Sequence, residues 1–140
     1  MADDDVTQDI AAEVVTLFGA INRRYAAEAQ AAAAPHGLTA MQAKALLAAR
    51  TPVPMRRIAD MLHAEPSNVT PVVDRLVEHG LLERRPNPAD RRGKLVAATD
   101  AGLTVIADLR ARMPFASEPL ANLTPAERVV LRDLLRRAVD

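Results

Sequence analysis

The sequence predicts a mainly α-helical fold that carries one small β-hairpin. Ala, Leu, Arg and Glu, which favour helices, are frequent, and apolar residues recur at steps of three and four along several segments. The stretch LLERRPNPADRRGKLVAA breaks this pattern, because two short runs flank a region interrupted by Pro86, Pro88 and Gly93. Such a stretch predicts two strands joined by a turn.

The bulk composition is that of one globular domain. The 140 residues can bury a sizeable core, and 18 basic residues balance 18 acidic ones. The sequence has no cysteine, which excludes disulfides, thiolate metal sites and thiol-based redox sensing. The acidic N-terminus is unlike a signal peptide, and no apolar run reaches the roughly 18 residues of a membrane span. We therefore expect a cytoplasmic protein with no membrane partner.

The first predicted element is a long amphipathic helix. Its apolar stripe is followed by an Ala-rich run that ends at Pro35 and Gly37. At 1.5 Å per residue it spans roughly 40 Å, which is too long for so small a core to cover. The helix is expected to pack against another subunit. Its stripe consists of Val6, Ile10, Val14, Leu17, Phe18, Ile21 and Tyr25.

Three shorter helices are predicted next. Thr39 and Gln42 have capping-box spacing and begin a helix that TPVP ends. Pro54 suits the first position of the following helix, which carries Ile58 and Leu62. After the turn-like HAEPSN, a third helix runs to Gly80, a typical residue just beyond a helix end.

The hairpin and two further helices complete the order. Strands are predicted at Leu81–Arg85 and Lys94–Ala98, on either side of a basic turn. Thr99 then caps a helix that extends to Met113, and Thr124 begins the last helix with a capping box and a proline at its first position.

Two adjacent helices of the central block have helix-turn-helix spacing. Their apolar residues suit two short helices that cross over a small core, and the second helix then exposes short polar side chains near its N-terminus. Such side chains fit a DNA major groove, and the helix end suits a phosphate. The exposed residues are Pro66, Ser67, Asn68, Thr70, Pro71 and Arg75, with Arg56 and Arg57 expected at the DNA backbone.

The basic stretch beside this helix predicts a DNA-contacting wing. Residues 84–94 contain five basic side chains and one acidic one, although the whole chain is neutral. A loop beside a recognition helix can place an arginine in the neighbouring minor groove, where the negative potential is concentrated. Asp90 lies two residues before Arg92, close enough to hold its guanidinium by a charge-assisted hydrogen bond. Phosphate contacts are expected from Arg84, Arg85, Arg91 and Lys94.

Several segments together resemble the MarR (multiple antibiotic resistance regulator) family of winged-helix transcription factors. They are LTAMQAKALLAA and MRRIADMLHAEPSNVTPVVDRLVEHGLLERRPNPADRRGKLVAATDAG, which cover roughly residues 38–103. The features shared with the family are Val69-Thr70, Val73-Asp74-Arg75-Leu76, Asp90-Arg91-Arg92 and Thr99-Asp100-Ala101-Gly102.

The resemblance implies a winged helix-turn-helix at residues 38–99. Residues 1–37 and 100–140 would be interlocking dimerisation helices of a homodimer that binds a pseudo-palindromic operator in double-stranded DNA. Arg92 matches the minor-groove arginine of the family, and Asp90 matches its orienting partner. Family members are mostly repressors, and many are released by small aromatic or phenolic anions. Repressor and activator remain alternatives for this chain.

Pro71 departs from the family pattern. It lies within the expected recognition helix, where family members often carry a residue able to touch DNA. Proline lacks an N–H and disfavours α conformation at the preceding residue. The regular helix therefore either begins near Pro71 or bends there, and base readout by this helix is affected.

Other functions receive little support. His36, His63 and His79 are isolated in the sequence, so no metal site is expected, and no cofactor motif is present. The sequence lacks a Ser-His-Asp order, a Gly-rich phosphate loop and paired carboxylates, so no enzyme is predicted. The rival reading is a winged-helix module that binds protein or ligand without DNA. Candidates for an effector pocket are Phe18, Asn22, Tyr25 and His36.

Overall fold

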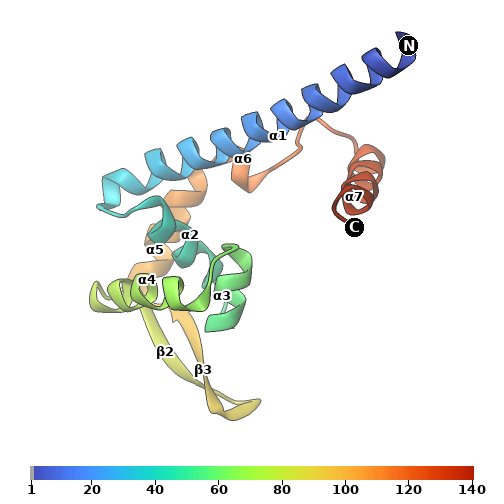
Figure 1. Ribbon diagram of the computed structural model, residues 1–140. Coiled ribbons are helices and arrows are strands. Elements are labelled where there is room, and N and C mark those ends of the chain that lie inside the picture. The colour runs from blue at the N-terminus through green and yellow to red at the C-terminus, as the bar shows by residue number, and fades with distance from the viewer. Residues whose placement is uncertain (1) are drawn as a thin grey trace.

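A computed structural model describes residues 2–140 as helices arranged around a small sheet (Figure 1). The elements in chain order are α1 (Ala2–Ala33), the 3₁₀ turn η1 (Ala34–His36), α2 (Ala40–Ala48), β1 (Val53–Pro54), α3 (Met55–Met61), α4 (Pro66–Glu78), β2 (Leu82–Asn87), β3 (Asp90–Ala98), α5 (Asp100–Ala111), α6 (Pro114–Ser117) and α7 (Pro125–Val139). The predicted mainly α fold with a hairpin is confirmed. None of the described helices is long and apolar enough to cross a membrane.

The long first helix forms as predicted, and only its C-terminal part is buried by the rest of the chain. Ala29, Ala32 and Ala33 are buried, whereas Val6 and Ile10 are more than half exposed. The helix ends at a 3₁₀ turn that contains Pro35, and Gly37 follows with a φ of 66°. In Figure 1, the N-terminal half of α1 extends well past α2 to α5 and the sheet.

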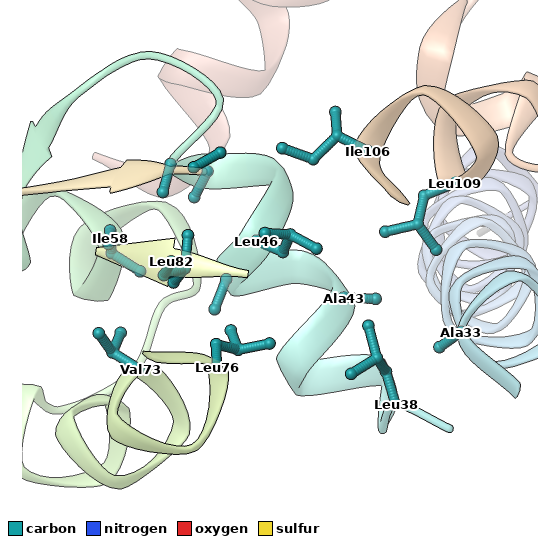
Figure 2. Packing of buried hydrophobic residues seen from close by; sticks show 14 of the residues in the cluster. Ala33, Leu38, Ala43, Leu46, Ile58, Val73, Leu76, Leu82, Ile106 and Leu109 are labelled. Carbon is teal, nitrogen blue, oxygen red and sulfur yellow. The ribbon is translucent and has the colours of Figure 1, made fainter. Parts of the chain in front are cut away.

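The core lies where α2, α3, α4 and the sheet meet, and it continues to α5 and the end of α1 (Figure 2). Leu46 of α2 is fully buried at its centre, near Leu76 of α4 and Leu82 of β2. Ile106 and Leu109 extend the core along α5. All these side chains are aliphatic, as the scarcity of aromatic residues requires. Because α5 shares this core, it ties the winged part of the chain to α1.

The sheet differs from the prediction in three ways. It has three antiparallel strands in the order β1-β3-β2, because Val53 and Pro54 pair with Val96 and Leu95. Pro54 therefore lies in β1 and is the N-cap of α3, so the helix begins at Met55, one residue later than predicted. The hairpin strands are also longer than predicted: most of the supposed basic turn is strand, and the connection is Pro88 and Ala89.

Helix ends follow their capping signals. Thr39 and Thr124 both form the predicted capping boxes, and the Thr99 hydroxyl accepts a hydrogen bond from the N–H of Gly102 at 3.1 Å. Gly80, with a φ of 73°, lies just beyond α4 as predicted. The short α6 was not predicted. It separates α5 from α7, which stands apart from the winged part in Figure 1.

Candidate nucleic-acid interface

Helix α4 exposes one polar face and buries the opposite one. Val69, Val73 and Leu76 are buried at steps of four and three, which fixes the orientation of the helix on the core. The predicted DNA-facing residues are consequently all exposed: Pro66, Ser67, Asn68, Thr70, Pro71 and Arg75. The structure thus groups this set on one helix surface.

Pro71 lies inside α4 and does not begin it. The helix spans Pro66–Glu78 without interruption, so the alternative in which it starts near Pro71 is wrong. Pro71 has no N–H, and the carbonyl of Ser67 therefore lacks its helical partner. The Thr70 hydroxyl donates to the carbonyl of Pro66 at 3.0 Å, one turn earlier. In an ordinary helix the N–H of the residue four positions later would bond to the Ser67 carbonyl. Its oxygen in the first turn of α4 is therefore open to another donor.

The wing extends from the same end of the molecule as α3 and α4 (Figure 1). One amide side chain and one carboxylate side chain stabilise its tip through their oxygens. The Asn87 Oδ1 accepts a hydrogen bond from the N–H of Ala89 at 3.0 Å, and the Asp90 Oδ1 accepts one from the N–H of Arg92 at 3.0 Å. The expected hydrogen bond from the Arg92 guanidinium to the Asp90 carboxylate is absent from the described residues. Asp90 holds the backbone, because its short side chain reaches the amide two residues on.

Two of the predicted phosphate-binding arginines are already paired. Arg84 of β2 bonds to the Asp74 carboxylate of α4, and this pair joins the wing to the recognition helix. Arg85 bonds to Glu83 on the same strand, with 2.6 Å between Nη2 and Oε1. The acidic partners were missed by sequence reasoning. The two-residue spacing on one strand could have indicated that Glu83 pairs with Arg85. No local spacing indicates that Asp74, which lies on α4, pairs with Arg84 on β2.

The remaining cations of the wing have no acidic partner within residues 2–140. Arg91, Arg92 and Lys94 are exposed on β3 and make no ion pair in this part of the chain. Arg56 and Arg57 are likewise exposed, on the first turn of α3. Uncompensated charge at these positions produces the local positive field that a neutral chain lacks overall.

The predicted effector residues do not surround one described cavity. Phe18 and Asn22 are exposed on α1, while the Tyr25 ring packs on Phe115 with 4.6 Å between centroids. His36 Nε2 donates to Asp108 Oδ2 at 2.5 Å, which joins η1 to α5. A cavity of about 710 Å³ lies nearby, between α1, α5, α6 and the segment that leads to α7. Its polar and aromatic lining includes Arg24, Arg110, Phe115 and Glu118.

A helix-turn-helix pair followed by a basic hairpin, on a frame of long helices, defines a winged helix-turn-helix regulator. Comparison with known proteins agrees. The model of the MarR family matches residues 41–94. The multiple antibiotic resistance protein MarR of Salmonella typhimurium is 34% identical over 110 residues, which cover 74% of this chain and 74% of that protein.

Two solved structures are similar along most of their length. CouR of Rhodococcus jostii RHA1, bound to p-coumaroyl-CoA, has a TM-score of 0.72 and 30% identity and covers 88% of this chain and 89% of its own. A mutant MarR of E. coli, complexed with operator DNA, has a TM-score of 0.66 and 27% identity, with 91% and 94% covered. The chain belongs to the MarR family and is a transcriptional regulator.

Proposed function

We propose that this regulator binds a pseudo-palindromic site in double-stranded DNA as a homodimer and represses transcription until a small effector releases it. The recognition helix α4 enters the major groove, and Arg92 at the wing enters the adjacent minor groove. Arg91, Lys94, Arg56 and Arg57 contact phosphates. The similarity to a MarR solved with operator DNA supports this arrangement.

The observation that carries the proposal is the juxtaposition of unpaired charge and exposed polar side chains. The cations of β3 have no acidic partner in the described chain, and they flank a helix that shows Ser67, Asn68 and Thr70 to solvent. Phosphates attract the first group, and base edges suit the second. Arg84 and Arg85 contribute less to phosphate binding, since each already pairs with a carboxylate.

Homodimer formation is supported by exposed apolar surface at both ends of the chain. Val6, Ile10 and Leu17 on α1, and Val130 and Leu134 on α7, are each more than half exposed. A monomeric protein rarely shows so much contiguous apolar surface to water. Residues 1–37 and 100–140 therefore carry dimerisation, and residues 38–99 carry DNA binding, although α5 also contributes to the shared core.

Release by an effector is supported by the similarity to CouR, whose structure holds p-coumaroyl-CoA. The cavity beside α1 and α5 combines apolar side chains with the guanidinium groups of Arg24 and Arg110. This lining suits a small aromatic or phenolic anion. Such a ligand would act by shifting the two winged parts relative to each other.

The rival function is a winged helix that binds protein or ligand without DNA. Such a module has no need for unpaired arginines on a protruding hairpin. The deciding experiment is selection from random duplexes, followed by titration of the winner and a scrambled duplex over a salt series. Tight binding of the winner alone, with log affinity falling by about 0.9 per phosphate contact against log salt, supports the proposal. Equal weak binding, or none at low salt, overturns it.

A further inference from the structure

The break that Pro71 makes in the hydrogen bonding of α4 leaves a backbone acceptor near the start of the recognition helix. Each carbonyl in the first turn of a regular helix accepts the N–H of the residue four positions later. Pro71 has no N–H to give to the Ser67 carbonyl, and its ring crowds that oxygen. Carbonyls on the solvent side of a helix also tilt outward, so the Ser67 oxygen is accessible from outside the helix.

No side chain of residues 2–140 takes the place of the missing N–H. Thr70 has the right spacing, because a threonine hydroxyl can donate to the carbonyl three or four residues before it. Its hydroxyl donates to the carbonyl of Pro66 at 3.0 Å and is therefore not available to Ser67. The Ser67 oxygen keeps its capacity to accept, which solvent fills in the free protein.

The open carbonyl lies on the face of α4 that points away from the core. Ser67 and Pro71 are four residues apart, so they lie one above the other on the helix. Both are exposed, and they lie opposite the buried row of Val69, Val73 and Leu76. A helix carbonyl points along the axis toward the residue four positions later, so the Ser67 oxygen lies between two exposed residues. In the proposed complex this face enters the major groove.

An acceptor at this position discriminates among the groups of DNA. Phosphate oxygens are acceptors themselves and cannot bond to a carbonyl. In the major groove the donors are the N6 amino group of adenine and the N4 amino group of cytosine, whereas guanine O6 and N7 and thymine O4 are acceptors. Binding displaces water from the carbonyl, so the facing base must supply a donor or the oxygen is left unpaired.

We propose that the Ser67 carbonyl accepts a hydrogen bond from the amino group of an adenine or a cytosine in each half-site, and that Pro71 keeps the carbonyl open for it. This inference rests on the proposed function, and it gives Pro71 a role in specificity that acts through the backbone. With any other residue at position 71, its N–H would fill the Ser67 carbonyl. The departure of Pro71 from the family pattern is thus a source of base readout.

Pro71→Ala tests the inference, because alanine supplies the N–H that closes the Ser67 carbonyl. Alanine also favours helix, so the variant should fold, which circular dichroism and urea unfolding check. The selected operator is resynthesised with one amino group removed at a time, by replacing an adenine with purine or a cytosine with 2-pyrimidinone. Fluorescence anisotropy at matched salt then gives the affinity of both proteins for each duplex.

The expected result is a loss that depends on both the amino group and Pro71. At one position in each half-site, removal of the amino group should weaken wild-type binding roughly three- to tenfold and Pro71→Ala binding by less than about twofold. Any weakening of the duplex by the modified base affects both proteins equally and cancels in this comparison.

Pro66→Ala is the matched control. Pro66 is the first residue of α4, where a missing N–H costs the helix no hydrogen bond. The substitution removes a proline ring from the same turn and leaves the Ser67 carbonyl open. Whatever its own affinity for the operator, this variant should show the wild-type loss at the same position.

Three outcomes would overturn the inference. Equal losses for wild type and Pro71→Ala at every position would mean that no amino group depends on the open carbonyl. A loss seen only when thymine is replaced by uracil would assign Pro71 an apolar contact with the thymine methyl group. In both cases tight, specific operator binding by the wild type would leave the proposed function standing. Failure to select any operator would overturn the proposed function and this inference together.

Discussion

The Asp90 Oδ1 accepts a hydrogen bond from the backbone N–H of Arg92 at 3.0 Å, at the start of β3. This contact ties the acidic residue of the wing to the chain on which Arg92 stands, and it leaves the guanidinium without an acidic partner in the described residues. The residue thus sets the shape of the wing tip. Its effect on DNA binding follows from that geometry.

The first prediction separates the hydrogen bond that Asp90 accepts from the effect of its negative charge. Asp90→Asn keeps an oxygen acceptor for the Arg92 N–H, whereas Asp90→Ala removes it. Both variants lose the same negative charge, so the difference in their operator affinity isolates the hydrogen bond. We expect Asp90→Asn to bind the selected operator more tightly than Asp90→Ala by ~0.5–1.5 kcal/mol, measured by fluorescence anisotropy. Equal affinities would show that the acceptor is unimportant.

Arg92 itself should contribute one groove contact. Arg92→Ala is expected to weaken operator binding by ~1–3 kcal/mol at matched salt. Arg91→Ala should act on all sequences alike and reduce the salt slope by roughly 0.9, as for one phosphate contact. Arg137→Ala on α7 removes the same charge far from the wing and is the control. Unchanged operator affinity of the Arg92 variant would refute the wing assignment.

The pair between Arg84 and Asp74 should stabilise the fold more than it serves DNA. It connects β2 to α4, and both side chains are partly exposed. A double-mutant cycle with Arg84→Ala and Asp74→Ala, followed by urea unfolding, should give a coupling of ~0.2–1 kcal/mol. Additive effects on the free energy of unfolding would mean that the pair contributes nothing.

The helices could be predicted from the sequence, whereas the extent of the sheet that forms the wing could not. The helices follow from apolar spacing and caps, which are local signals. The strand β1 is only Val53–Pro54, and it is created by pairing with Val96 and Leu95, more than forty residues away. The lengths of β2 and β3 were underestimated because Pro86 and Gly93 read as turn residues. Pro86 is tolerated because β2 is the edge strand, and a register irregularity follows at Pro86/Asn87.

The candidate DNA-binding site likewise has features that the sequence predicts and features that it does not. The exposed face of α4 could be predicted because Val69, Val73 and Leu76 fix its orientation by periodicity alone. Which cations are free could not be predicted, because that depends on contacts between elements, such as that of Arg84 with Asp74. The role of Asp90 depends on a backbone conformation that spacing does not specify.

Asp108 is expected to contribute to the pH dependence of stability. Its hydrogen bond with His36, together with the hydrogen bond and the positive charge of Arg112, holds the pKa of the Asp108 carboxyl below its usual value of 3.8. A carboxyl with a lowered pKa in the folded state stabilises the fold above its unfolded pKa. That contribution is lost as the pH falls through the lowered value.

The measurement is the free energy of unfolding in urea at several pH values between about 7 and 3. Wild-type protein should lose stability on the acid side of about pH 4 more steeply than Asp108→Asn, which cannot titrate. Asp60→Asn is a matched control, because Asp60 is exposed on α3 and forms no ion pair in the described chain. Parallel acid limbs for wild type and Asp108→Asn would contradict the prediction.

Gly102 should tolerate no side chain, because the first turn of α5 lies against the carbonyl of Leu81. A Cβ at position 102 would lie 2.0 Å from the Leu81 oxygen and 3.3 Å from the Cβ of Ala98. That oxygen already accepts the N–H of Thr99 at 3.1 Å, so it cannot move away without breaking the bond that begins α5. The obstacle is backbone, and a rotamer change cannot relieve it.

Gly102→Ala is therefore expected to lower the free energy of unfolding by ~1–3 kcal/mol, although alanine favours helix over glycine by ~1 kcal/mol. Ala101→Leu, one residue earlier on the exposed side of the same turn, should change it by less than ~0.5 kcal/mol. Urea unfolding of both variants measures the difference. A Gly102 variant as stable as the wild type would mean that α5 can shift away from Leu81, the residue before β2. The wing would then not be held rigidly against α5.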